Sequence, residues 1–176
     1  MGIFSKLRSP AVAGLLKDQH LLEMAIRREF RCSEEYVRRE VVPRLADEDI
    51  HGLDIAFRDG FGELTGQVKK RFLPAIPFSA RFIVDRVACT PWEKRVYLRL
   101  EEVQPLDLDW LTRRMVERLP FLDYDSGIVV CDLMRIPRLA ELFAYRVKGV
   151  RVCDFLTIKG LDVRPGEIVG RLGVVL

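Results

Sequence analysis

The sequence predicts an α+β fold: a curved, mostly antiparallel sheet of six or seven strands packed around a helix, with an N-terminal helical lead-in. Two observations carry this prediction. Apolar residues recur with a helical period near the start of the chain, and from about residue 50 they alternate with a period of two. The strand-like runs also follow one another without the strand–helix alternation of a parallel sheet. We therefore expect a helical segment over residues 1–48 and a sheet-plus-helix domain over residues 49–176, forming one globular unit.

Two helices are predicted in the N-terminal segment. Residues 11–31 carry an apolar stripe, and Pro10 suits a first helical turn. Ser33, followed by two glutamates, is typical of an N-cap, so a second short helix should begin there. Pro43 should end it near Val42, because the residue before a proline avoids helical backbone. The stripe of the first helix consists of Val12, Leu15, Leu22, Ile26 and Phe30.

Four antiparallel strands are predicted next, because apolar and polar side chains alternate in four successive runs. The segment LPAIPF, residues 73–78, is broken by two prolines and is typical of a sheet edge. One apolar face per strand indicates that one side of the sheet is buried and the other is exposed to solvent. The four runs fall within residues 52–60, 61–70, 80–89 and 95–103.

A helix over residues 107–120 is expected to cover the buried side of the sheet. Asp107 or Asp109 can cap it, and three arginines should point away from its apolar stripe. A short strand at 127–134, a short helix at 136–146 and two or three closing strands should follow. The stripe of the covering helix consists of Leu108, Leu111, Met115 and Leu119.

The chain should close in a hairpin. The tetrapeptide RPGE, residues 164–167, places proline and glycine at the two central positions of a type II turn. Apolar residues then share one face of a strand, so we expect the last strand to be paired and buried. These residues are Ile168, Leu172, Val174 and Leu176.

The composition excludes several classes of protein. With 176 residues, 49% hydrophobic and 31% charged, the chain is typical of a globular domain. The net charge of +3 is small, and acids lie among the basic clusters at 27–31, 38–39 and 69–71, so no nucleic-acid partner is expected. No apolar run could span a bilayer and no secretory signal is visible. We expect a cytoplasmic protein that can work at the surface of the inner membrane.

No pattern predicts an enzyme, a metal site or a cofactor. Nucleotide-binding glycine motifs are absent. The acidic clusters at 47–49 and 107–109 suit helix caps and solvated loops better than an acid–base pair. His20 and His51 are the two histidines. The cysteines lack the paired spacing of zinc sites and are expected to be buried thiols: Cys32, Cys89, Cys131 and Cys153.

Apolar surface beyond a minimal core is the most informative feature. Long strands with few covering helices leave room for an apolar cavity beside the helix at 107–120, and a tightly packed core explains the same pattern. The start of the chain, with Phe4, Lys6 and Arg8, could rest on an anionic bilayer. The residues expected to line a groove are Phe82, Leu98, Leu100, Leu111 and Met115.

The closing stretch KGLDVRPGEIVGRL also carries a family resemblance. Its matching residues are Gly160, Leu161, Val163, Pro165, Gly166, Glu167 and Ile168. Together with the order of elements over residues 50–176, they make the chain similar to the YceB-like small bacterial proteins of the tubular lipid-binding (TULIP) superfamily. The resemblance implies a strongly curved sheet wrapped around a long helix, with an apolar groove for a lipid.

These observations predict non-catalytic binding of a hydrophobic ligand, a lipid or acyl chain, with the membrane surface as one setting. The alternative is a protein-interaction or scaffold module whose N-terminal helix docks a partner protein or a second copy of the chain.

Overall fold

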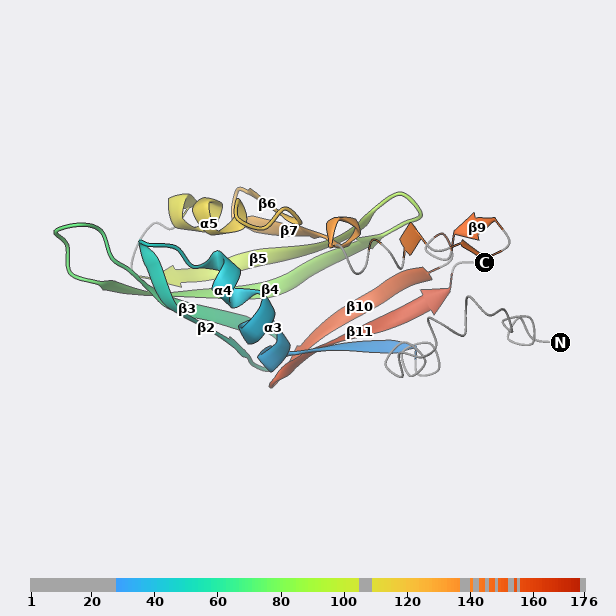
Figure 1. Ribbon diagram of the computed structural model, residues 1–176. Helices are drawn as coiled ribbons and strands as arrows, with labels where there is room; N and C mark the ends of the chain where they lie inside the picture. Colours follow the sequence, from blue (N-terminus) through green and yellow to red (C-terminus); the bar gives the residue numbers. More distant parts are fainter. Residues whose placement is uncertain are drawn as a thin grey trace.

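The computed structural model describes residues 28–104, 109–136 and 156–174, together with residues 140, 143–144, 146–147, 149–151 and 154. Within these residues the α+β class is confirmed (Figure 1). The elements in chain order are β1 (Glu29–Ser33), α3 (Glu34–Glu40), α4 (Val42–Leu45), β2 (Ile50–Phe57), β3 (Gly62–Val68), β4 (Ile76–Cys89), β5 (Lys94–Gln104), α5 (Asp109–Val116), β6 (Leu122–Asp125), β7 (Ile128–Asp132), η2 (Leu133–Arg135), β8 (Arg146–Val147), β9 (Val150–Arg151), β10 (Leu156–Arg164) and β11 (Glu167–Val174).

Two antiparallel sheets organise the fold. The larger has six strands in the order β2-β3-β4-β5-β7-β6 and does not close on itself. The smaller has the order β1-β11-β10, and β8 and β9 form a separate two-stranded ladder. The long hairpin of β4 and β5 runs from the β3–β4 loop at one end of the molecule toward the other end (Figure 1).

β10 lies alongside β4 and connects the two sheets. The amide of Gly60, in the β2–β3 turn, donates to the carbonyl of Val163 (3.0 Å). Toward the other end of β10, the hydroxyl of Thr157 donates to the carbonyl of Cys89 (3.1 Å). The small sheet is therefore attached to the large one toward both ends of β10.

Two apolar clusters form the core. The first lies beneath α5 and the second lies where the two sheets meet, and α4 contributes one residue to each. α4 therefore packs into the same core as the sheets. The first cluster consists of Leu45, Ile50, Val68, Phe78, Leu111, Met115 and Leu119. The second consists of Val42, Ile55, Phe57 and Val163, with Phe82 and Ile168 packed against it.

The helix predicted over residues 11–31 is wrong at its end, since residues 29–31 belong to β1. The remainder of that helix, up to residue 27, lies outside the described residues. Phe30 is the register partner of Gly170 in β11, and the missing side chain at Gly170 leaves room for the Phe30 ring. A pairing between opposite ends of the chain leaves no trace in local periodicity.

The second helix begins where predicted, because the hydroxyl of Ser33 accepts a hydrogen bond from the amide of Tyr36 (3.2 Å). It ends at Glu40, before the predicted Val42. Pro43 does not terminate it. This proline lies in the first turn of α4, where an amide hydrogen would have no helical partner.

β4 begins at Ile76, earlier than the alternation predicts, so Pro77 lies inside a strand. At Pro77, β4 pairs with β3 alone, because its pairing with β5 begins at Ser79. The missing amide hydrogen of the proline therefore removes no hydrogen bond to β5.

The helix predicted over 107–120 ends earlier than predicted, because α5 spans Asp109–Val116 and a turn follows it, while residues 107–108 lie outside the described residues. The single strand predicted at 127–134 is one arm of a hairpin formed by β6 and β7. β6 escapes prediction because only four residues alternate. Of the helix predicted at 136–146, the described residues 140, 143 and 144 are helical, but its predicted end is wrong because Arg146 belongs to β8. Among the helices that are described, none is long and apolar enough to cross a lipid bilayer.

The closing hairpin forms as predicted. Gly166 has a φ of +81°, which the third position of a type II turn requires. β11 is the central strand of the small sheet, paired on both sides. Ile168 packs against the second core cluster, and Val169, on the opposite face, is buried. Near the turn, both faces of this strand are therefore covered, whereas Arg171 is exposed and the predicted core residue Leu176 lies outside the described residues.

Candidate functional site

The residues predicted to line a groove fall into two separate regions. Leu111 and Met115 lie in the first core cluster, with exposed fractions of 0% and 5%. Phe82 packs against the second cluster and is paired with the half-buried Leu100. Leu98 is half-buried on the same strand, β5. The helix residues thus belong to the buried core, while the three strand residues lie together on β4 and β5.

Other residues singled out from the sequence cannot be placed. Phe4, Lys6 and Arg8, the predicted membrane contacts, lie outside the described residues, as does Cys153.

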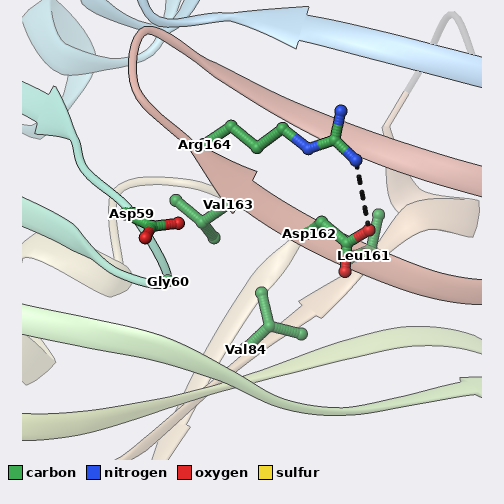
Figure 2. Close-up of a pocket in the computed structure, with 7 residues that line it drawn as sticks. All are labelled: Asp59, Gly60, Val84, Leu161, Asp162, Val163 and Arg164. Carbon is green, nitrogen blue, oxygen red and sulfur yellow. Dashed lines mark ion pairs between the residues drawn. The ribbon is translucent and has the colours of Figure 1, made fainter.

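A pocket of about 330 Å³ opens between the two sheets (Figure 2). β10 forms one wall, and the β2–β3 turn with β4 forms the other. The carboxylate of Asp162 and the guanidinium of Arg164 pair at 3.7 Å, so two of its charges are matched. The lining includes no thiol, imidazole or amine that could act as a nucleophile. It consists of Asp59, Gly60, Val84, Leu161, Asp162, Val163 and Arg164.

Reactive groups elsewhere are also held in structural roles. Burial, followed by the Asp132 charge and the Cys32 thiol, raises the pKa of Cys131 to about 12. Burial likewise raises the pKa of Cys32, so both thiols stay protonated at neutral pH. Lys94 is buried, and its ammonium group donates to the carbonyl of Thr90 within the β4–β5 hairpin. Across the described part of the chain, no group of three or more His, Cys, Asp or Glu side chains could hold a metal ion.

An exposed apolar pair lies in the β3–β4 loop, which projects from one end of the molecule (Figure 1). Phe72 is 94% exposed and Leu73 is 53% exposed. The turn is closed by a hydrogen bond from the amide of Leu73 to the carbonyl of Lys70 (2.9 Å). The φ of Phe72 is +72°, a conformation that is uncommon for a bulky residue. The loop therefore presents Phe72 to solvent in a strained backbone, as is frequent at functional sites.

Three cations precede this apolar pair: Lys69, Lys70 and Arg71 are all exposed. Within the described residues, none of them forms an ion pair with a carboxylate. The Arg71 guanidinium instead lies 5.5 Å from the centre of the Phe72 ring. We refer to residues 69–73 as the tip. It combines three cations lacking carboxylate partners with two exposed apolar side chains.

A small apolar cleft of about 200 Å³ lies beside the tip. Strands β3 and β4 supply two of its walls and α5 supplies a third through Trp110. The ammonium nitrogen of Lys70 lies 4.6 Å from the centre of the Trp110 ring, which places a positive charge beside the cleft. Its lining consists of Val68, Lys70, Leu73, Pro74, Ile76 and Trp110.

An ionic clamp holds α5 in place. The carboxylate of Asp47, with 3% of its side chain exposed, accepts hydrogen bonds from Arg114 (2.7 Å) and Arg118 (2.8 Å). The amides of Asp49 and Ile50 donate to the same carboxylate, each at 2.8 Å. Burial opposes the ionisation of Asp47, but the two amides and Arg114 outweigh it and hold its pKa below the usual range. The clamp therefore fixes the helix that carries the tryptophan of the cleft.

Neither the tip nor the cleft follows from the patterns used for the sequence prediction. The sequence alone predicts a solvated face for residues 69–71 and a sheet edge for the LPAIPF segment. The informative signal is their junction: the run KKRFL puts three cations directly before two large apolar residues in a loop. No protein-family model matches the sequence, and no curated protein and no solved structure is significantly similar to it.

Proposed function

We propose that the protein binds lipid without catalysis and attaches to anionic membrane surfaces through the tip. The observation that carries this proposal is the exposure of Phe72 next to three cations that lack carboxylate partners within the described residues. Such a surface suits a bilayer, which offers apolar chains below a layer of negative headgroups. On this proposal the protein works at the cytoplasmic leaflet of the inner membrane.

The magnitudes are adequate for reversible attachment. Each Lys or Arg near an anionic bilayer contributes about 1 kcal/mol, so three contribute about 3 kcal/mol. Full burial of Phe72 and Leu73 would add about 1.5–3 kcal/mol each. A protein partner would also cover an apolar tip, but the unmatched positive charge favours a surface dense in negative charge. The scaffold alternative depends on the helix predicted at the start of the chain, and residues 1–27 lie outside the described residues.

Vesicle sedimentation tests the proposal. The full chain should bind vesicles of phosphatidylcholine mixed with phosphatidylserine and should not bind phosphatidylcholine alone. Added salt should weaken binding, because it screens charges at the surface. Changing Lys69, Lys70 and Arg71 together to Ser should weaken binding about 100-fold, at about 1 kcal/mol per charge.

The control is Trp92→Ser. Trp92 is 82% exposed in the β4–β5 turn, at the other end of β4 from the tip. This variant should bind vesicles as the unchanged chain does. If the unchanged chain fails to bind phosphatidylserine vesicles at low salt, the proposal is wrong. Binding that survives the loss of all three cations would show that another surface is responsible.

A further inference from the structure

We infer that the cleft beside Trp110 takes the end of one acyl chain of an anionic phospholipid, so that the protein holds an individual lipid as well as the membrane surface. This inference rests on the proposed function and adds the identity of the site and its occupant. It concerns the region where β3, β4 and α5 meet next to the tip.

The lining favours a hydrocarbon chain. Apart from the Lys70 side chain, every lining residue is apolar. A polar ligand would lose hydrogen bonds to water there without gaining partners, whereas a chain gains apolar contact. The cleft has a volume of about 200 Å³. This volume suits the end of one chain and is too small for a whole lipid.

The charge beside the cleft favours an anionic headgroup. Lys70 lies over the face of Trp110, and Lys69 and Arg71 flank it in sequence. A phosphate at this position would be attracted to three cations that have no carboxylate partner among the described residues. The same residues therefore provide a positive entrance and an apolar interior, which is the polarity of an anionic lipid.

The walls are preformed. Val68 is 3% exposed and is paired in register with Ile76, so the β3–β4 wall is part of the main sheet. Trp110 is carried by α5, which the clamp at Asp47 anchors. A ligand entering such a site needs little ordering of the protein, which favours binding.

Tryptophan fluorescence provides the test, because Trp92 and Trp110 are the two tryptophans of the chain. Trp92→Phe leaves the cleft residue as the reporter, and Trp110→Phe leaves a reporter at the opposite end of β4, roughly 40 Å away at ~3.3 Å per residue. Hexyl phosphate, used as a monomer in solution, should change Trp110 emission in a saturable way. Inorganic phosphate should not, and hexanol should bind about tenfold more weakly or worse, since it lacks the charge.

Vesicles of brominated phosphatidylserine give the second readout. Bromine on the acyl chain should quench Trp110 and leave Trp92 unquenched. Ile76→Phe, which fills the cleft, should weaken hexyl phosphate binding about tenfold or more while vesicle sedimentation changes less than about threefold. The hexyl phosphate titration of Trp92→Phe leaves the cleft unchanged and involves no bilayer, so it remains decisive if Ile76→Phe folds poorly.

The outcomes separate this inference from the proposed function. If vesicles bind but hexyl phosphate leaves Trp110 unchanged and chain bromine does not quench it, the lipid site is wrong and surface attachment stands. If hexyl phosphate and inorganic phosphate act alike, the cleft contributes nothing and the inference is again overturned. If vesicles do not bind at all, both proposals fall.

Discussion

At the scale of single residues, Asp47 anchors the helix α5 and so positions Trp110 in the cleft without lining the cleft itself. The acidic cluster at 47–49 looks like a solvated loop in the sequence. In the structure the Asp47 carboxylate receives two amides and two guanidinium groups and is almost fully buried. Hydrogen bonds to a charged group are stronger than neutral ones, so this residue should matter for stability.

Asp47→Asn should reduce the free energy of unfolding by about 1.5–3 kcal/mol at neutral pH, the scale of a hydrogen bond to a charged group. The folded-state pKa of Asp47 lies below its ordinary value of 3.8, so its contribution is complete above that value. The contribution is lost as pH falls through the folded-state pKa. The stability difference between the two proteins, measured by urea unfolding, should therefore shrink below about pH 4.

Asp123→Asn is the matched control, because Asp123 is 57% exposed and pairs with Arg135 at 3.2 Å on the surface. Surface ion pairs contribute about 0–1 kcal/mol, so Asp123→Asn should change the free energy of unfolding by at most about 1 kcal/mol. If both substitutions changed the free energy of unfolding equally, the clamp at Asp47 would contribute no more stability than a surface ion pair.

At the scale of elements, α3 takes the place of a neighbouring strand along the edge strand β2. The carboxylate of Glu34 accepts a hydrogen bond from the amide of Phe57 (2.7 Å). Arg38 donates to the carbonyl of Ile55 (2.8 Å) and to the Asp54 carboxylate (2.6 Å). These contacts occupy backbone groups that would otherwise be open to pairing with another chain.

The packing of β3 depends on a strand glycine. A Cβ atom at Gly66 would lie 2.6 Å from Leu53 and 2.9 Å from the buried ring of Phe78. Gly66→Ala should therefore cost about 1–3 kcal/mol, as overpacking does. At Gly160 in β10 the nearest atom is the flexible end of Arg171, at 3.3 Å.

Gly160→Ala should thus be neutral or slightly stabilising, because alanine restricts the unfolded chain. Urea denaturation of both variants measures the difference. A Gly66→Ala protein as stable as the control would mean that the Phe78 ring moves aside freely.

At the scale of the whole molecule, the small sheet depends on β11, which lies between β1 and β10. Removing residues 172–176 would unpair the Leu156, Thr157 and Ile158 end of β10. Because β10 also contacts β4 and the second core cluster, the truncated chain should melt at a clearly lower temperature. Thermal unfolding followed by circular dichroism measures this.

Phe72→Ser keeps every strand and removes no core contact, so it should melt like the unchanged chain. If the truncated chain also melted like the unchanged one, the C-terminal residues of β11, from Leu172 onward, would contribute no stability. The contact between the two sheets would then depend on residues other than those removed.

The sequence by itself determines the local features of this protein. Alternation identifies the four successive strands β2 to β5 of the main sheet, Ser33 marks the start of α3, and RPGE specifies the closing turn, where Gly166 takes a positive φ. Each of these depends on the residues within one turn or one strand, where backbone sterics and side-chain periodicity act directly.

Only the tertiary structure decides which distant segments meet. It makes residues 29–31 a strand, because Gly170 leaves space for Phe30, and it joins Asp47 to Arg114 across 67 positions of the chain. It also brings Lys70 over Trp110 and so creates the cleft. Burial and charge pairing between remote residues depend on how the elements pack, and no local pattern encodes that.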